Sequence, residues 1–202
     1  IVHGEVAVVE SGDTRIAYDL ATGEELWRRS GGYLLATHDG VIAEVSDGRL
    51  SLLSPRTGAE LWSVPSEEEW LSLTRWGDDI VVYQGSFGVV STGDGSPLGA
   101  VAALDLATGK VRWVYQTVHH DIWDMDIGGQ PSLVDIDTPK GKVPSVVATT
   151  KRGDIYVIDR RDGSLVVPAP EKPVPTSNPA AGDTLSPTQP FSALTFLPER
   201  NI

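Results

Sequence analysis

The chain has 202 residues, and its 16 Lys and Arg against 28 Asp and Glu give a formal net charge of −12. Nucleic-acid binding is excluded as a main role, because phosphate contact requires clustered basic side chains and the first hundred residues contain no Lys. No apolar run approaches the roughly 18 residues of a membrane span, and without Cys the chain forms neither disulfides nor thiolate metal sites.

In chain order, short apolar runs rich in Val, Ile, Leu and Tyr alternate with turn residues. The runs cover residues 6–9, 41–45, 50–53, 80–83, 101–106, 111–115, 146–150 and 155–158. Their period of two is typical of β-strands. A helical turn is expected at one place only, where Ser66 followed three residues later by Glu69 fits a capping box. The sequence therefore predicts an all-β fold.

A nine-residue repeat organises these strands. In each copy a strand ends in Asp or Ser, a Gly follows in a tight turn, and an aromatic or aliphatic residue stands four positions after the Gly. The copies are residues 19–27, 54–62 and 105–113, with a weaker one at 159–167. The Gly supplies the positive φ of the turn, and the Asp or Ser side chain can accept backbone N–H groups across it.

The spacing of the repeat is that of a β-propeller. Successive repeat glycines lie 35, 51 and 54 residues apart, which suits blades of four strands. We therefore expect about four blades. We expect Trp27, Trp62 and Trp113 to wedge one blade against the next rather than to contact a cofactor.

The repeat resembles the tryptophan-docking repeat of quinoprotein dehydrogenase propellers, which non-catalytic propellers of the outer-membrane assembly type also carry. Four later segments resemble, in order and spacing, the membrane-bound quinoprotein glucose dehydrogenases and their quinate and polyol relatives. These segments are TVHHDIWDMD at 117–126, TKRGDIYVIDRR at 150–161, VPAPEKPVP at 167–175 and LSPTQPFS at 185–192.

The resemblance implies a domain organisation. We expect residues 1–202 to form one partial propeller of an eight-bladed ring, with generic repeats over 1–95 and quinoprotein-like blades over 96–202. The remaining blades or another copy would then be needed to cover its open edges. A Pro-rich segment over 168–198 is expected to lie extended over the propeller face without ladder hydrogen bonds.

The resemblance also implies a chemistry. Pyrroloquinoline quinone (PQQ), with Ca²⁺ or Mg²⁺, would oxidise a hydroxyl of an aldose or polyol such as glucose, and electrons would pass to a quinone acceptor. The Asp of the Trp-Asp motif maps onto Asp124, as general base and metal neighbour. The basic residue that contacts the quinone oxygen maps onto Lys151. The family location implied is periplasmic and membrane-associated.

Other residues near these motifs have two interpretations each. His119, His120 and Asp121 are candidates for metal ligands or a proton relay, or they make structural hydrogen bonds. Asp126 is either an outer-shell acceptor or part of a capped turn. Trp123 either flanks the cofactor or packs between blades, and packing is favoured.

A function from another class stays open. Residues 1–100 contain no segment that we can match to the remaining metal ligands of the family, and the first half is strongly acidic. Both observations favour a non-catalytic propeller that serves as a protein-interaction scaffold.

Overall fold

The structure is a computed structural model that describes residues 2–36, 42–65, 71–76, 79–84, 100–121, 123, 125, 127–182 and 185–197. Within these ranges all regular structure is strand, which confirms the all-β prediction. The predicted helical turn at Ser66–Glu69 lies outside the described residues. Over the same ranges there is no helix that could cross a membrane.

Seventeen strands are present in this part of the chain. Their bounds are β1 Val2–His3, β2 Val6–Ser11, β3 Thr14–Asp19, β4 Glu25–Ser30, β5 Tyr33–Ala36, β6 Ile42–Ser46, β7 Arg49–Leu53, β8 Glu60–Pro65, β9 Leu71–Trp76, β10 Asp79–Gln84, β11 Ala100–Asp105, β12 Val111–Gln116, β13 Ser132–Thr138, β14 Gly141–Thr149, β15 Ile155–Asp159, β16 Glu171–Pro173 and β17 Thr188–Pro190.

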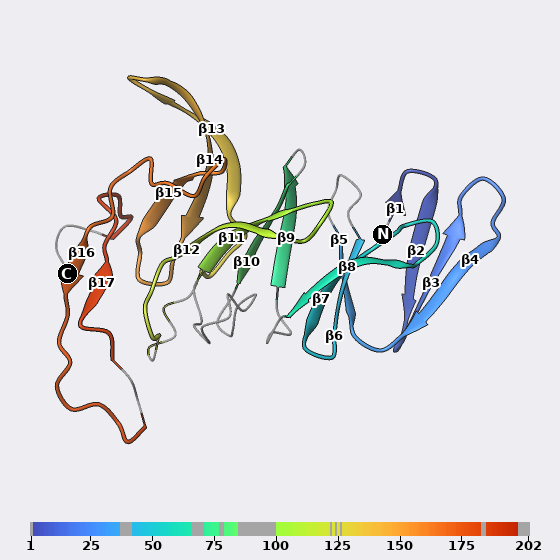
Figure 1. Ribbon diagram of the computed structural model, residues 1–202, viewed down its shortest axis with the longest axis horizontal. Helices are drawn as coiled ribbons and strands as arrows, with labels where there is room; N and C mark the ends of the chain where they lie inside the picture. The colour runs from blue at the N-terminus through green and yellow to red at the C-terminus, as the bar shows by residue number, and fades with distance from the viewer. Residues whose placement is uncertain are drawn as a thin grey trace.

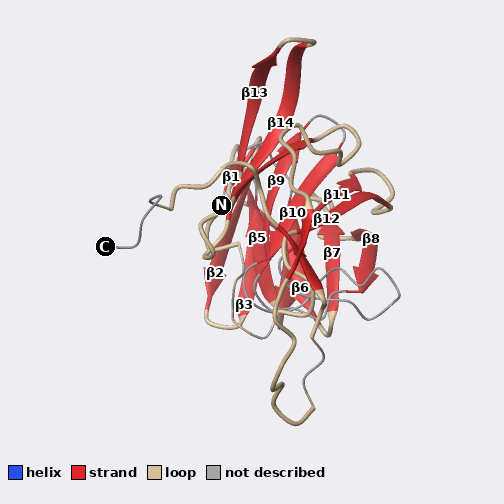
Figure 2. Ribbon diagram, turned by 90° about the vertical axis from the view of Figure 1, so that its left-hand side faces the viewer, coloured by secondary structure: helices blue, strands red, loops and turns tan. Residues whose placement is uncertain are grey.

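The strands form antiparallel meanders in chain order. Three sheets have four strands each, β1-β2-β3-β4, β5-β6-β7-β8 and β9-β10-β11-β12; a fourth has three, β13-β14-β15, and β16 and β17 form a hairpin. The sheets follow one another along the molecule from the N-terminal to the C-terminal end (Figure 1). The β13–β14 hairpin extends beyond the other strands (Figure 2). This is the arrangement of consecutive propeller blades.

Apolar clusters lie between successive sheets. One joins the first two sheets through residues such as Val8 and Ile42, a second joins the next pair through Leu52 and Leu104, and a third joins β11 to the fourth sheet. The alternation along β11 places even positions in one cluster and odd positions in the next, so both faces of this sheet are buried. Each core is thus shared by two neighbouring blades.

Each repeat tryptophan docks on the turn of the following sheet, as predicted. The indole Nε1–H of Trp27 donates to the carbonyl of Pro55 at 2.7 Å; Trp62 donates to Leu106 at 2.8 Å and Trp113 to Arg160 at 2.9 Å.

Glycine is required at the turn positions that the docked indole rings contact. A Cβ on Gly58 would stand 2.7 Å from the Trp27 ring, one on Gly109 would stand 2.6 Å from Trp62, and one on Gly163 would stand 2.9 Å from Trp113. All three glycines have positive φ, between 66° and 78°. The glycine therefore serves two purposes, since it allows the turn conformation and leaves room for the indole.

A buried charge cluster accompanies the first junction. The Glu44 carboxylate, 5% exposed, accepts hydrogen bonds from Arg29 at 2.5 Å and from Arg15 at 3.4 Å, and both arginines lie on the first sheet. Because both partners are supplied by the neighbouring blade, the pairing fixes how the two sheets face each other.

The Pro-rich segment is tied to the fourth sheet along β15. The carbonyl of Leu194 accepts from the amide of Ile155 at 3.0 Å, and the hydroxyl of Ser192 donates to the carbonyl of Ile155 at 2.6 Å. The expectation of an extended segment without ladder bonds is wrong for six residues, since Glu171–Pro173 pairs with Thr188–Pro190. Such pairing is possible because Lys172 and Gln189, at the centre of the hairpin, are not prolines. We call residues 168–197 the strap.

Candidate functional site

Lys151 lies in a tight turn that links β14 to β15. The turn is closed by the Thr150 amide, which donates to the carbonyl of Asp154 at 3.1 Å, and by the Gly153 amide, which donates to Thr150 at 2.9 Å. The side chain of Lys151 is exposed, whereas Thr150 is buried. The strand end therefore presents an ammonium group at the rim of the fourth sheet.

The Trp-Asp loop, residues 117–131, is shaped by Asp121. Its carboxylate accepts the backbone amides of Trp123 at 2.9 Å and Met125 at 2.7 Å. A carboxylate that accepts two main-chain donors is part of the local fold, which favours the structural interpretation of Asp121. Asp124 and Asp126 themselves lie outside the described residues.

The two predicted motifs meet through Lys151. Its Cγ lies 3.6 Å from the position that a Cβ on Gly128 would take, so the side chain passes along the Trp-Asp loop. The turn after β14 and the loop after β12 are far apart in sequence. The fold thus brings the Lys151 side chain close to Gly128 of this loop, while the assignment of Lys151 and Asp124 to one site stays a prediction.

A buried polar network holds these two segments to the strap. Arg152 forms an ion pair with Asp154 and donates to the carbonyl of Pro190 and, at 2.7 Å, to the hydroxyl of Tyr156. The Tyr156 hydroxyl lies 2.9 Å from the carbonyl of Pro190 and 3.2 Å from that of Thr117. Loop, turn and strap therefore share one network.

Burial raises the pKa of two tyrosines in and beside this network. Tyr156 is fully buried, and desolvation, aided by the charge of Asp154, raises the pKa of its hydroxyl well above the usual range. Desolvation also raises the pKa of the neighbouring Tyr115 to about 12. Both hydroxyls are consequently neutral hydrogen-bonding groups and not bases near neutral pH.

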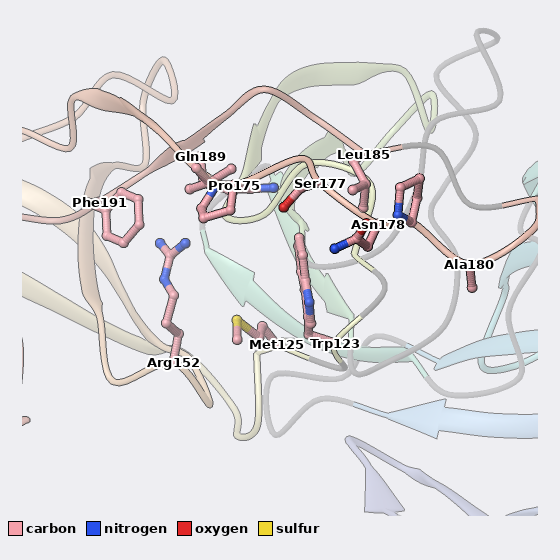
Figure 3. A pocket seen from close by; sticks show the side chains of 12 residues that line it. Trp123, Met125, Arg152, Pro175, Ser177, Asn178, Ala180, Leu185, Gln189 and Phe191 are labelled. Carbon is pink, nitrogen blue, oxygen red and sulfur yellow. The ribbon is translucent and has the colours of Figure 1, made fainter.

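A cavity of about 570 Å³ opens between the strap and the Trp-Asp loop (Figure 3). It is lined by Trp123, Met125, Arg152, Val174, Pro175, Ser177, Asn178, Pro179, Ala180, Leu185, Gln189 and Phe191. The lining is mostly apolar, with a few polar groups that could orient a ligand, as in small-molecule sites. Trp123 and Met125 stand on either side of Asp124 in sequence, and Arg152 follows Lys151.

Trp123 does not pack between sheets. Its side chain is 43% exposed and points into the cavity (Figure 3). The favoured packing interpretation is therefore wrong for this residue. Unlike the repeat tryptophans, Trp123 does not follow a glycine turn at an interval of four residues, and it lies in a loop instead of a strand.

His119 acts as a structural connector to the strap. Its ring nitrogens lie 3.2 Å from Gln116 Oε1 and 2.9 Å from Glu171 Oε1. Its backbone amide donates to the side-chain oxygen of Gln189 at 2.7 Å, and its carbonyl accepts from the Gln189 amide group at 2.6 Å. Burial raises the pKa of Glu171, but hydrogen bonds from His119 and Thr188 outweigh it and leave the pKa below its usual range.

His120 borders a second, polar cavity of about 320 Å³. Gln116, His119, Ser186 and Thr188 complete its lining. The φ of His120 is 45°, which is uncommon for a residue with a side chain. The described part of the chain contains no group of three or more His, Asp or Glu that could hold a metal ion, so the histidines are not assembled as a ligand set there.

The described residues fit one edge of a bound PQQ molecule. Lys151 offers an ammonium group, and Trp123 offers an aromatic face in the adjoining cavity. The buried Thr150 hydroxyl has no hydrogen-bond partner among the described residues, but it lines neither of the two cavities. The predicted metal neighbour, Asp124, lies outside the described residues.

The row of sheets and their docked tryptophans define a β-propeller of the PQQ type. A family described as "Glucose/ethanol/alcohol dehydrogenase, beta-propeller domain" matches residues 88–202, which is more than half of the chain. The chain belongs to this PQQ family.

Curated proteins that are similar to this chain are named as dehydrogenases. A quinoprotein glucose dehydrogenase from Escherichia coli (strain K12) is 55% identical over 103 residues, which are 51% of this chain and 13% of that protein. The glycerol dehydrogenase large subunit of Gluconobacter thailandicus is 37% identical over 148 residues, 69% of this chain and 20% of that protein. The chain therefore spans only a small part of these relatives.

Solved structures support the fold alone. A quinohemoprotein alcohol dehydrogenase, ADHIIG from Pseudomonas putida HK5, matches 85% of this chain and 34% of its own, with a TM-score of 0.61 and 18% identity. A europium-containing methanol dehydrogenase matches 81% of this chain and 39% of its own, with a TM-score of 0.60 and 23% identity.

Sequence reasoning missed Arg152, Tyr156 and Gln189 as organisers of the site. Arg152 and Tyr156 stand within a segment that the resemblance had marked, but their partner carbonyls belong to Thr117 and Pro190, far away in sequence. The available signal was compositional: Tyr156 falls at a strand position whose neighbours are all aliphatic, and a buried Tyr needs a hydrogen-bond partner.

Proposed function

We propose that this chain is part of a PQQ-dependent dehydrogenase that oxidises a hydroxyl of an aldose or polyol and passes electrons to a quinone acceptor. The observation that carries the proposal is the closeness of the Lys151 side chain to Gly128 of the Trp-Asp loop, beside the cavity under the strap. The relatives named glucose, glycerol and quinate dehydrogenases support a polyhydroxylated substrate.

The further assignments are part of the same proposal. They are a Ca²⁺ or Mg²⁺ ion beside Asp124, a periplasmic location, generic repeats over 1–95 with quinoprotein-like blades over 96–202, and additional blades or another copy at the open edges. The relatives named as dehydrogenases favour this function over a non-catalytic scaffold.

The residues of the chain have distinct tasks in this chemistry. When bound, PQQ supplies the carbonyl that accepts hydride. The ammonium of Lys151 would lie at the quinone oxygen and favour negative charge there. The carboxylate of Asp124 would take the proton of the substrate hydroxyl, and a neighbouring cation would keep it ionised. The apolar wall formed by Trp123 and Phe191 would limit the access of water.

Cofactor uptake and turnover test these tasks separately. The chain is incubated with PQQ and Ca²⁺ or Mg²⁺, binding is followed by cofactor absorbance, and glucose-dependent dye reduction is measured. Lys151→Ala should abolish uptake, while Lys142→Ala, in an exposed pair with Asp137, should not change it. Uptake unaffected by Lys151→Ala would refute the assignment of the cofactor contact.

The base is tested by an isosteric change. Asp124→Asn should leave PQQ uptake measurable and reduce turnover by about 10²- to 10⁴-fold, because general-base catalysis contributes on this scale. Asp137→Asn is the matched control, since Asp137 is exposed and pairs with Lys142 on the β13–β14 hairpin. Equal turnover of Asp124→Asn and the parent chain would exclude Asp124 as the base.

A further inference from the structure

The tip of the strap, residues 175–180, forms one wall of the larger cavity. Pro175, Ser177 and Asn178 line it from this side, and the Trp123 indole faces them from the Trp-Asp loop (Figure 3). Lys151 is not among the lining residues, so the cavity adjoins the position proposed for the quinone instead of containing it. The strap tip is therefore placed to contact a part of the substrate that is remote from the reacting hydroxyl.

The polar side chains that line this cavity differ in their remaining capacity for hydrogen bonds. Arg152 donates to a carboxylate, a hydroxyl and a carbonyl of the chain, and the Gln189 amide group is bonded to both backbone groups of His119. Ser177 and Asn178 are exposed, and within the described part of the chain neither side chain has a hydrogen-bond partner. One hydroxyl and one carboxamide, which can both donate and accept, are thus available to a ligand.

The backbone at Asn178 has an unusual and restricted conformation. Its φ is 60°, one of three positive values among the described residues other than glycine. Asn adopts this conformation more readily than most residues with a side chain. Prolines at positions 175 and 179 restrict the chain on both sides. A backbone that is already restricted loses little conformational freedom when its side chain binds a ligand, and this favours recognition.

The two walls together suit a ring that has an apolar face and hydroxyl groups at its rim. The C–H bonds on one face of a sugar ring can pack on the Trp123 indole, which is 43% exposed. The hydroxyls of that ring would then meet Ser177 and Asn178. Among the described lining residues only Arg152 is charged, and it is ion-paired with Asp154, so a carboxylate finds no unpaired cation among them. The cavity therefore favours a neutral ring.

We propose that the strap tip selects the substrate. A neutral, polyhydroxylated ring stacks on Trp123, and Asn178, assisted by Ser177, hydrogen-bonds hydroxyls of that ring other than the one that is oxidised. Asn178 is thus a specificity-determining residue. The inference rests on the proposed function, which it deepens by assigning the residues that recognise the substrate and the class of ring that they accept.

Asn178→Gly separates recognition from a turn role. Glycine adopts positive φ without strain, so this variant preserves the turn and removes only the amide. Thr176→Ala is the matched control, since Thr176 is exposed on the strap tip and does not line the cavity. Trp123→Ala tests the stacking and should remove measurable sugar binding.

Sugar binding is measured on the chain without cofactor, by saturation-transfer NMR with glucose, its mono-deoxy derivatives and glucuronate. Asn178→Gly should weaken glucose binding roughly five- to tenfold, as expected for the loss of one hydrogen bond between uncharged groups. At least one deoxy derivative should bind the parent chain more weakly than glucose by a similar factor. This difference should disappear in Asn178→Gly, because the partner of the missing hydroxyl is gone. Glucuronate should bind more weakly than glucose.

The proposal is overturned if glucose does not bind the folded parent chain, or if Asn178→Gly binds it as tightly as Thr176→Ala does. Binding that survives Trp123→Ala unchanged, or deoxygenation effects that are the same in the parent and in Asn178→Gly, would overturn it as well. Equal binding of glucuronate and glucose would contradict the neutral class.

Turnover with PQQ distinguishes this inference from the proposed function. In the loaded chain Asn178→Gly should raise KM for glucose roughly five- to tenfold with little change in kcat, because the contact is remote from the reacting hydroxyl. Failure of PQQ uptake together with the expected sugar binding would refute the proposed function and leave this recognition site standing. Normal uptake with an unchanged KM in Asn178→Gly would refute this inference alone.

Discussion

Replacing Arg152 by Ala should be among the most destabilising single changes in the fourth sheet. The Arg152 side chain is 14% exposed and its partner Asp154 is 8% exposed, so the substitution leaves a buried carboxylate without its countercharge. Removal of one member of a buried ion pair costs about 3–5 kcal/mol. The guanidinium also lies 4.2 Å from the centre of the Phe191 ring, and this contact is lost as well.

The loss of stability in Arg152→Ala should be largest where the strap meets the fourth sheet. Urea unfolding followed by tryptophan fluorescence gives the total change, and hydrogen exchange gives its location. The amides that join the strap to this sheet should exchange faster in Arg152→Ala; they are that of Ile155, which donates to the carbonyl of Leu194, and that of Phe196, which donates to the carbonyl of Gly153. Because a loss of about 4 kcal/mol approaches the whole stability of a small domain, Arg152→Lys serves as a milder variant that retains the charge.

An exposed arginine provides the control. Arg28→Ala removes a surface pair with Glu25 and should leave the urea midpoint unchanged. The reasoning fails if Arg152→Ala shifts the midpoint no more than Arg28→Ala does, or if exchange increases everywhere except in the strap.

Two further predictions concern packing and pH. Gly109→Ala should destabilise the chain by about 2–4 kcal/mol in urea titrations, because its methyl group would stand 2.6 Å from the Trp62 ring and the turn needs positive φ. Stability should also fall as the pH rises from about 10, where an unfolded tyrosine ionises, toward about 12, since Tyr115 and Tyr156 have raised pKa values and keep their protons in the folded state. Urea midpoints at pH 8, 10 and 11.5 measure this loss, which should shrink in Tyr115→Phe; a midpoint that rises over this interval would contradict it.

The blade repeat could be predicted because its determinants lie within nine residues. The turn glycine, the strand-ending Asp or Ser and the Trp four residues later all act locally or on one neighbouring blade, so the packing of Trp27 between blades could be predicted from spacing. The arrangement at Arg152 could not, since its partners are main-chain carbonyls. Every residue type offers a carbonyl, and therefore no side-chain pattern indicates which one is used.

The pairing within the strap also could not be predicted from the sequence. Its prolines indicated an extended conformation, but the two positions at the centre of the hairpin, Lys172 and Gln189, decide where pairing is possible. Trp123 could not be distinguished from the repeat tryptophans by residue type. What separates it is the absence of the preceding turn glycine, and that criterion was available in the sequence.

The docking of each tryptophan on the turn of the next sheet has an evolutionary consequence. Each four-strand unit carries a tryptophan on its last strand and, in the turn before that strand, the glycine on which the tryptophan of the preceding unit docks. One stretch of gene therefore encodes both the docking side chain and the docking site. When such a stretch is duplicated in tandem, the new copy meets its neighbours on each side with complementary parts already encoded. Lengthening of the molecule then needs no compensating mutation, whereas Val167 marks a place where this self-matching series has been interrupted.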